Sequence, residues 1–381
     1  MEGVVFGKGT LVRVRVKIAA VVGVLLVATC LVGAIAAYGR ADRLDVSARP
    51  AQGTVRSSAA TSSKPGTITV AAVGDLCFAS SVRRLIARSG AKAPFSATHK
   101  ILSAADVTIG NLECALSTRG HAVPGKTYTF EGPPSAIKGL TWAGFDFAAQ
   151  GNNHARDFGS VALLDTIKNL DKAKIAHAGA GASSKSAFKA AYITRNGAKI
   201  AYLSYSQIGP SSFKAGSHRS GTAFTLRLAT VTNAVKVAKK KADYVIVSIH
   251  WGIERRTTPT ATQVEFGRAA VRAGANLVLS HHPHVIEGVE FYRKGLIAYS
   301  LGNFVFSPGH ADGHDTMVLT LTLGPKGIRD VVARPLHIDP YGRPRPATGS
   351  TRSRVLREIA SRSRGRHTKV TLSGGVAKLR K

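Results

Sequence analysis

The chain has 381 residues, which is enough for one large domain or two ordinary domains with a buried core. Its 53 Lys and Arg against 21 Asp and Glu give a net charge of +32, so the expected partners are anions: nucleic acid, phosphate-rich lipid or wall polymer, or a polycarboxylate. Three cysteines, one of them inside an apolar segment, exclude a disulfide framework, although Cys77 and Cys114 are able to form one bridge.

The N-terminal region has the pattern of a membrane-targeting segment. Residues 1–17 are basic and precede an uncharged apolar stretch at residues 18–38, about the length that crosses a bilayer as a helix. The bias of Lys and Arg toward the cytoplasm predicts a cytoplasmic N-terminus, a single-pass cell-membrane anchor and an extracytoplasmic body. The alternative is secretion after cleavage near Ala34-Ile35-Ala36. Residues 39–66, rich in Ala, Ser, Thr, Arg and Pro, have the composition of a flexible linker.

Strand and helix patterns alternate through the body of the chain, residues 67–345, and then strands pair through tight turns. The predicted strands are Thr67–Val73, Asp106–Ile109, Ala143–Ala149, Lys199–Tyr205, Asp243–Ile249 and Ala275–Leu279. The predicted helices are Ser81–Ser89, Val161–Leu170, Ala229–Lys241 and Thr260–Ala273. Two hairpins are predicted: Val289–Tyr292 with Leu296–Ser300, and Thr316–Leu323 with Ile328–Pro335. This order predicts a mixed α/β fold with two sheets packed together.

Two further segments, one aromatic and one basic, do not follow the alternation of strands and helices. Tyr128–Phe130 is typical of an edge strand, from which Lys126 would contact an anionic substrate. Residues 346–381 are dominated by Lys and Arg and predict a mobile polycationic tail. A solubilising role and a specific anion-binding role both fit that tail.

Polar side chains follow five of the predicted strands where each strand ends. They are Asp75; Asn111 and Glu113; Asn152, Asn153 and His154; His250; and His282 and His284. Strand ends are where α/β folds build their sites. The mixture of carboxylate, amide and imidazole groups suits Mn, Fe or Zn better than Ca or Mg. Alternation along a strand predicts that His282 and His284 point the same way and that His281 points away, as a hydrogen-bonded supporting residue.

Six short motifs occur in a fixed order along this body. They are Gly74-Asp75; Asn111-Leu112-Glu113; Gly144-Phe145-Asp146 leading to Asn152-Asn153-His154 with Asp157 and Gly159; His250-Trp251-Gly252-Ile253-Glu254; His281-His282-Pro283-His284-Val285; and Tyr299-Ser300-Leu301-Gly302-Asn303-Phe304. This set resembles the CapA family of poly-γ-glutamate capsule-synthesis proteins, in the calcineurin-like metallophosphatase superfamily. The resemblance implies a four-layer αββα sandwich over residues 67–345, joined to the N-terminal transmembrane helix.

The resemblance also implies roles for individual residues. Two divalent ions would share Glu113 as a bridge, with Asp75 and His284 at one ion and Asn153, His250 and His282 at the other. His154 would act as the general acid and Asp157 would orient its ring. Cys77 stands where the superfamily has a histidine, Glu113 where most phosphatases have Asp, and Ser280 where a glycine is common, so one or two ions are expected.

The remaining residues of the motifs are expected to support the ligands or to contact substrate. They are Asn111, Asn152, Cys77, Trp251, Glu254, His281 and Asn303. Trp251 fits a core position and a substrate platform equally well, and Glu254 fits a solvated surface better than a cleft. Asn303 fits either a hydrogen bond across the site or simple packing.

The resemblance favours an anchored metal-dependent hydrolase or transferase that acts on poly-γ-glutamate or a similar anionic polymer, with other membrane proteins of capsule synthesis as partners. A non-catalytic polymer-binding or scaffold subunit of a capsule export complex is the first alternative, and an exported phosphoesterase unrelated to capsule is the second. The predicted membrane anchor argues against nucleic acid as the partner, because an exported body meets wall polymer and lipid first.

Overall fold

The computed structural model describes residues 66–307, 309 and 313–381. The predicted cytoplasmic segment, membrane segment and linker lie outside these described residues, apart from Gly66. Within the described part of the chain, no helix combines the length and apolar character needed to span a membrane.

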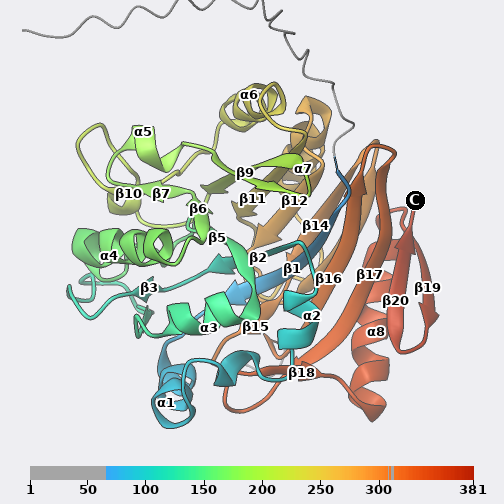
Figure 1. The fold of residues 1–381 in the computed structure, drawn as a ribbon, viewed down its shortest axis with the longest axis horizontal. Helices are drawn as coiled ribbons and strands as arrows, with labels where there is room; N and C mark the ends of the chain where they lie inside the picture. Colours follow the sequence, from blue (N-terminus) through green and yellow to red (C-terminus); the bar gives the residue numbers. More distant parts are fainter. Residues whose placement is uncertain (1–65, 308, 310–312) are drawn as a thin grey trace, which may run out of the picture. The chain divides into compact units, whose positions relative to one another are not determined.

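Two large β-sheets form the centre of the domain (Figure 1). The larger sheet has the order β19-β20-β17-β16-β1-β2-β5-β6. Its strands are β1 (Ile68–Leu76), β2 (Val107–Leu112), β5 (Phe145–Ala149), β6 (Ala176–Ala178), β16 (Asp315–Gly324), β17 (Gly327–Ile338), β19 (Lys369–Ser373) and β20 (Val376–Arg380), with β15 (Asn303–Val305) beside β1 and β18 (Pro344–Pro346) beside β17.

The second sheet has the order β13-β14-β12-β11-β9-β8. Its strands are β8 (Ala191–Arg195), β9 (Ala198–Ser206), β11 (Tyr244–His250), β12 (Leu277–His281), β13 (Ile286–Tyr292) and β14 (Gly295–Leu301). Two short pairs complete the strands: β3 (Ala115–Leu116) with β4 (Glu131–Gly132), and β7 (Ala180–Gly181) with β10 (Gly221–Thr222).

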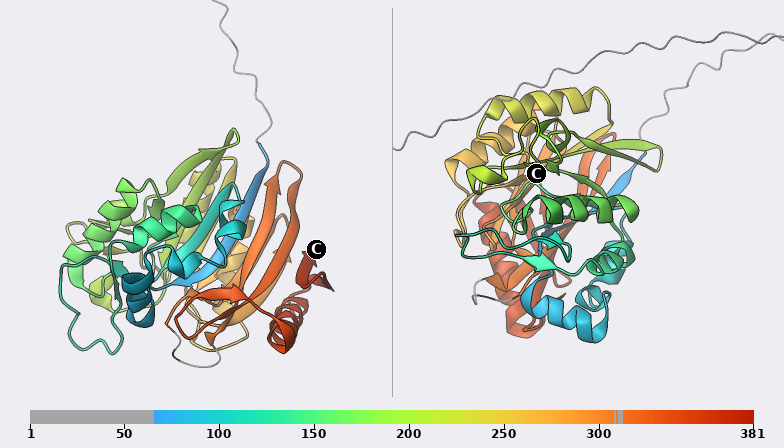
Figure 2. Two further views of the ribbon diagram at one scale, coloured as in Figure 1. Left: turned by 60° about the horizontal axis from the view of Figure 1, so that its bottom comes forward. Right: turned by 90° about the vertical axis from the view of Figure 1, so that its left-hand side faces the viewer.

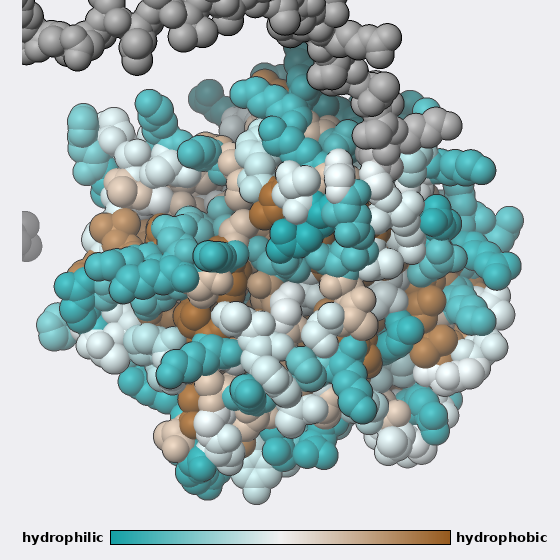
Figure 3. Space-filling model, in the orientation of Figure 1, coloured by the Kyte–Doolittle hydropathy of each residue, from teal (hydrophilic) through white to brown (hydrophobic). Residues whose placement is uncertain are grey.

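The helices of the described chain connect and cover these sheets. They are α1 (Ser80–Ser89), α2 (His99–Ser103), α3 (Ala136–Ala143), α4 (Gly159–Lys172), α5 (Ser184–Ala187), α6 (Leu228–Lys239), α7 (Ala261–Ala273) and α8 (Gly349–Arg364), with short 3-10 turns at Ala93–Phe95 and Ser211–Phe213. Figure 3 shows hydrophilic side chains over most of the visible face, interrupted by small separate hydrophobic patches.

Three apolar clusters hold the layers together. One lies between the sheets and joins Val70 and Ile109 of the larger sheet to Ile246 and Leu279 of the second. A second cluster packs α1, α2 and α3 on the outer face of the larger sheet, and a third packs α6 and α7 on the outer face of the second sheet. Burial of both faces explains why the central strands are almost continuously apolar. The predicted mixed α/β fold is confirmed, as are both hairpins, β13–β14 and β16–β17.

The prediction of a mobile basic tail is wrong. Residues 349–364 form α8, whose Val355 and Ile359 enter the cluster between the sheets, and β20 pairs with β17. Figure 2 shows α8 in red beside the long orange strands. At Gly288 of β13, which has φ +112, a Cβ would lie 2.7 Å from the backbone of Arg362, so glycine is required for this close approach. Arg352, Arg357 and Arg364 of α8 are exposed, whereas Arg362 is half-buried and its Nη1 donates to the Ile286 carbonyl oxygen over 2.6 Å.

The predicted edge strand at Tyr128–Phe130 is also wrong. Pairing with β3 begins only at Glu131 in β4. The Phe130 N–H instead donates to Asp157 Oδ2 over 2.8 Å, so this loop is fixed to the candidate site rather than to a sheet.

Candidate metal centre

The sheet topology brings the predicted polar residues to one edge. Strands β1, β2 and β5 run parallel, and so do β9, β11, β12 and β14, so their carboxyl ends lie together. Asp75 pairs in register with Asn111, and His250 pairs with His281. Asp75, Glu113, His250 and His282 are all buried there.

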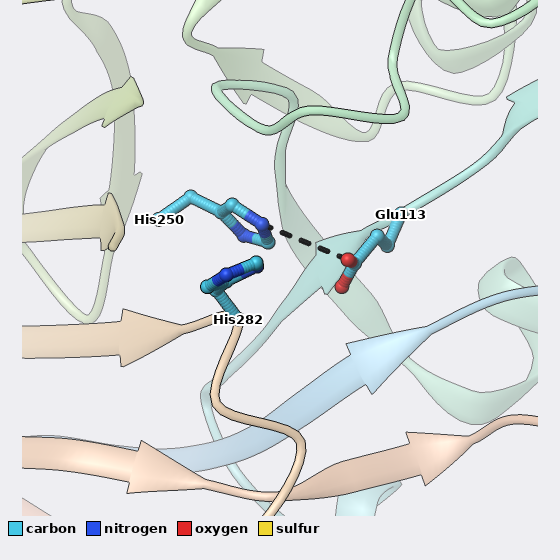
Figure 4. Close-up of side chains that lie close together, drawn as sticks. All are labelled: Glu113, His250 and His282. Carbon is cyan, nitrogen blue, oxygen red and sulfur yellow. Dashed lines mark ion pairs between the residues drawn. The ribbon is translucent and has the colours of Figure 1, made fainter. Parts of the chain in front are cut away.

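Glu113 lies at the middle of the cluster. Its Oε1 atom is 3.6 Å from His250 Nε2, 3.8 Å from His284 Nε2 and 4.0 Å from His154 Nε2. Figure 4 shows the rings of His250 and His282 beside the carboxylate of Glu113. These separations exceed hydrogen-bond length, so the side chains face one another around Glu113 Oε1 without bonding to it.

Buried polar atoms without hydrogen-bond partners indicate whether these residues are suited to bind a metal ion. Glu113 Oε1, His250 Nε2, Asn153 Oδ1 and His282 Nδ1 are buried and have no hydrogen-bond partner among the described residues. Leaving such atoms unpaired is costly, and a divalent ion would satisfy those of Glu113, His250 and His282 together. The ligand atoms of Glu113, His250 and His282 lie within 4.8 Å of one another, and so do those of Asp75, Glu113 and His284. The donor set therefore fits one or two divalent ions that share Glu113.

Two asparagines hold the carboxylates in place. Asn111 Nδ2 donates to Asp75 Oδ1 over 2.9 Å and to Glu113 Oε2 over 3.0 Å. Asn152 Nδ2 in turn donates to Asn111 Oδ1 over 3.0 Å, and Asn152 Oδ1 accepts from the His154 N–H at 3.0 Å. Asn111 thus orients both candidate carboxylate ligands, and Asn152 orients Asn111 and the His154 backbone.

Burial and close charges separate the pKa values of the two carboxylates. Burial favours the neutral form of Asp75, but hydrogen bonds and charge interactions with His281 and His284 outweigh it and hold the Asp75 pKa well below its usual value. Burial and the neighbouring Asp75 raise the pKa of Glu113 well above its usual value. A cation at the shared position would offset the cost of ionising Glu113.

The backbone at the histidine cluster differs from the strand that the alternation predicted. Strand β12 ends at His281, and both His282 (φ +99) and His284 (φ +59) are in a loop with left-handed backbone. Their ring centroids are nevertheless only 5.8 Å apart. Strained backbone at two candidate ligands is typical of functional sites. Burial lowers the pKa of His282 to about 3 and that of His250 well below its usual value, which keeps both rings neutral and able to bind metal.

His154 has two charged neighbours. Its Nδ1 lies 2.7 Å from Asp157 Oδ2 and 2.9 Å from Lys126 Nζ, and Lys126 also forms an ion pair with Asp157. Burial lowers the pKa of His154, Asp157 opposes that shift, and Lys126 adds to it. The sequence pattern predicted the proximity of Asp157, but Lys126 was expected at a substrate. Its loop has no periodic pattern that would have located it beside His154.

Other predicted supporting residues lie at or near the centre. His281 Nδ1 is 3.1 Å from Asp75 Oδ1, and His284 Nδ1 lies 2.8 Å from Asn303 Oδ1, so Asn303 bonds across the site. Glu254 is exposed, yet its carboxylate lies within 4.8 Å of ligand atoms of His282 and His284.

Two residues face the core instead of the centre. Trp251 is fully buried and packs edge-to-face on Phe266, so it is a core residue and not a substrate platform. Cys77 and Cys114 are buried free thiols in the apolar cluster under the helices of the larger sheet. Burial and Cys114 raise the pKa of Cys77 well above its usual value, which disfavours the thiolate that a metal requires. Among the described His, Cys, Asp and Glu residues, Cys77 belongs to none of the clusters able to hold an ion.

Residues 69–308 match the family described as bacterial capsule synthesis protein PGA_cap. The chain belongs to this family. Related proteins include the capsule biosynthesis protein CapA of Bacillus anthracis, 30% identical over 77% of this chain and 72% of that protein. The PGA biosynthesis protein CapA of Bacillus subtilis is 31% identical over 70% of each chain. Among solved structures, a putative 5′-nucleotidase from Staphylococcus aureus is 14% identical, with a TM-score of 0.45 over 74% of this chain and 55% of that one.

Proposed function

We propose that this chain is a membrane-anchored, extracytoplasmic capsule-synthesis protein that acts on poly-γ-glutamate or a similar anionic polymer through a metal-dependent hydrolase or transferase site of the metallophosphatase type. The relatives named for capsule and PGA biosynthesis support the pathway. The observation that carries the chemistry is the convergence of unpaired buried donors on Glu113, His250 and His282.

In this proposal, some residues of the candidate metal centre bind the ions and others transfer a proton. Asp75, Glu113, Asn153, His250, His282 and His284 would hold one or two ions of Mn, Fe or Zn. A divalent ion, when bound, supplies Lewis-acid polarisation of a phosphoryl or acyl oxygen. His154 Nε2 faces Glu113, and Asp157 orients the ring by accepting from Nδ1–H, so the imidazolium form of His154 would carry the second proton, at Nε2, that passes to the departing oxygen. The net charge of +32 concentrates a polyanion near the domain.

The test is an assay of the purified full-length chain in neutral detergent, with Mn, Fe or Zn restored. We expect bound metal by elemental analysis and turnover of γ-linked polyglutamate or of phosphoesters, both reduced in His250→Ala. His154→Ala should retain the metal and lose turnover, because His154 is not a ligand. Absence of metal together with absence of turnover on both substrate classes would refute the proposal.

One observation favours a second candidate function. Cys77 packs in the apolar cluster where the superfamily has a metal-binding histidine, which leaves Asp75 and His284 to hold one ion with Glu113. A non-catalytic polymer-binding or scaffold subunit of a capsule export complex fits a weakened site. Capsule formation that survives both His154→Ala and His250→Ala in cells would support this candidate over catalysis.

A further inference from the structure

A cavity of about 1170 Å³ lies at the end of the two sheets opposite the candidate metal centre. It is lined by the β13–β14 turn and the β16–β17 turn. Register places Leu323 of β16 beside Ile68, at the start of β1, and Leu296 of β14 beside Leu277, at the start of β12. The candidate metal ligands lie at the far ends of β1 and β12. Nine residues of β1 span roughly 30 Å, so the cavity and the metal centre are separate sites.

The cavity is surrounded by basic side chains from several elements. These include Lys239, Arg272, Lys294, Lys326 and Arg380. The acidic residues among the described lining are Asp243 and Asp330, and both are engaged: Asp243 Oδ2 accepts from the Lys199 N–H at 2.8 Å, and Asp330 pairs with Arg329 at 3.3 Å. Lys294, Lys326 and Arg380 form no ion pair with any described residue, so their charges are uncompensated within this part of the chain.

The walls of the same cavity are partly apolar. Phe291 and Ile328 are only partly buried against the core between the sheets, and both line the cavity. Exposed cations beside exposed apolar walls suit a ligand with an anionic group and an apolar body. A polymer of carboxylates alone would leave the apolar walls in water.

The chain reaches the described domain at this cavity. Tyr244, which lines the cavity, donates its hydroxyl hydrogen to the Gly66 carbonyl oxygen over 3.0 Å. Gly66 follows the sequence predicted as linker, and the apolar stretch at residues 18–38 precedes that linker. In Figure 1 the start of β1 lies at the same end of the sheets as the β16–β17 turn. The described part of the chain therefore begins, at Gly66, beside the basic cavity.

We infer that this cavity binds the headgroup of an anionic phospholipid, with the lipid phosphate at Lys294, Lys326 and Arg380 and the glycerol and upper acyl carbons against Phe291 and Ile328. Binding there docks this end of the domain on the membrane and turns the candidate metal centre away from it. The inference rests on the membrane anchoring in the proposed function but not on metal chemistry at the opposite end.

The experiment uses the full-length chain in neutral detergent and dioctanoyl phosphatidylglycerol below its critical micelle concentration. Hydrogen exchange at residues 291–296 and 324–329 reports occupancy of the cavity. We expect saturable protection that weakens at least about 10-fold in the triple variant Lys294→Ser, Lys326→Ser, Arg380→Ser, since losing a charge-assisted hydrogen bond to the phosphate costs about tenfold or more in affinity. A matched control, Lys168→Ser, Lys185→Ser, Lys189→Ser, removes the same charge from exposed sites outside the cavity and should change the affinity less than about twofold.

Four comparisons decide the result. If the control triple variant weakens lipid binding equally, the effect comes from net charge alone and the inferred lipid site is wrong. Equal protection by dioctanoyl phosphatidylcholine would remove the role of the cations. Stronger protection by a γ-linked glutamate oligomer would assign the cavity to the polymer, and equal protection by inorganic phosphate would assign it to a free anion. Unchanged far-ultraviolet circular dichroism and urea unfolding midpoints in both triple variants serve as the folding control, so failure of the metal assay leaves the lipid inference standing.

Discussion

His154 lies between an acidic and a basic residue that shift its pKa in opposite directions. Asp157 raises that pKa and Lys126 lowers it. A general acid must be protonated to act, so under the proposed role of His154 turnover should fall as pH rises through its pKa. Asp157→Asn should lower turnover about 10–100-fold and move this fall to lower pH. Lys126→Met should move the fall to higher pH. The measurement is a pH–rate profile of each metal-loaded variant.

The two variants act as controls for each other. General loss of packing would lower turnover in both without moving the pH midpoint. Shifts in the same direction, or no shift in either, would contradict the assignment of His154 as the acid that Asp157 positions.

Glu287 of β13 is a buried carboxyl outside the metal centre. Gln263 donates to its Oε2 at 2.8 Å, while Oε1 has no hydrogen-bond partner among the described residues, and burial raises its pKa to about 8. The folded state therefore binds more protons here than the unfolded state between pH 4.5 and about 8. The stabilising contribution of the Glu287 carboxyl to the free energy of unfolding is fully present below pH 4.5. It is lost as pH rises from 4.5 to about 8. Glu287→Gln should raise the free energy of unfolding by roughly 1–3 kcal/mol at pH 8.5.

Urea unfolding at pH 5 and pH 8.5 tests this prediction. The gain in Glu287→Gln should be present at pH 8.5 and small at pH 5. A gain of equal size at both values would show that ionisation of Glu287 is not its cause.

The candidate ligands could be predicted from the sequence because polar residues directly after buried strands converge when the strands are parallel. The direction in which each side chain points after its strand ends could not be predicted from the sequence. His282 and His284 reach the centre through left-handed backbone and not through strand alternation, and Trp251 and Cys77 turn into the core. These directions depend on tertiary packing, which a local pattern does not contain.

Helix α8 is the element with the largest difference between pattern and structure. Its buried residues are Val355, Leu356, Ile359, Ala360 and Ser363, a narrow stripe within an Arg- and Ser-rich segment. The composition of the segment therefore indicated a solvated tail, although the helical spacing of the stripe was present. The strands and hairpins of the body were easier to predict because their apolar runs are long and end at Gly, Asn or Lys turns.

Packing of α8 can be tested at one buried position. Ile359→Ala should lower the free energy of unfolding by about 2–5 kcal/mol, because it leaves a cavity in the cluster between the sheets. Arg357→Ala, on the exposed side of the same helix, should change it by less than about 0.5 kcal/mol. Urea unfolding of both variants gives the comparison, and equal effects would show that α8 does not hold the core.

At the scale of the whole molecule, metal binding should stabilise the fold. The candidate ligands come from both sheets, so an ion that binds them links the two halves of the core. Saturating Mn or Zn should raise the melting temperature of the chelator-treated protein by roughly 5–10 °C, by preferential binding to the folded state. His250→Ala should abolish this rise.

The matched control is His177→Ala, which removes a histidine of β6, the edge strand of the larger sheet, that is paired with Asp171. This variant should keep the full rise in melting temperature. A rise that persists in His250→Ala would place the ion elsewhere in the molecule.

The contact of α8 with β13 has a consequence for biosynthesis. Strand β13 is made well before α8, so the apolar edge between the sheets stays open on the nascent chain until α8 has been synthesised. A premature stop codon between residues 305 and 349 would therefore produce an aggregating polypeptide and not a smaller working domain. The core therefore closes only when translation is complete, which keeps the earlier strands available to chaperones until then.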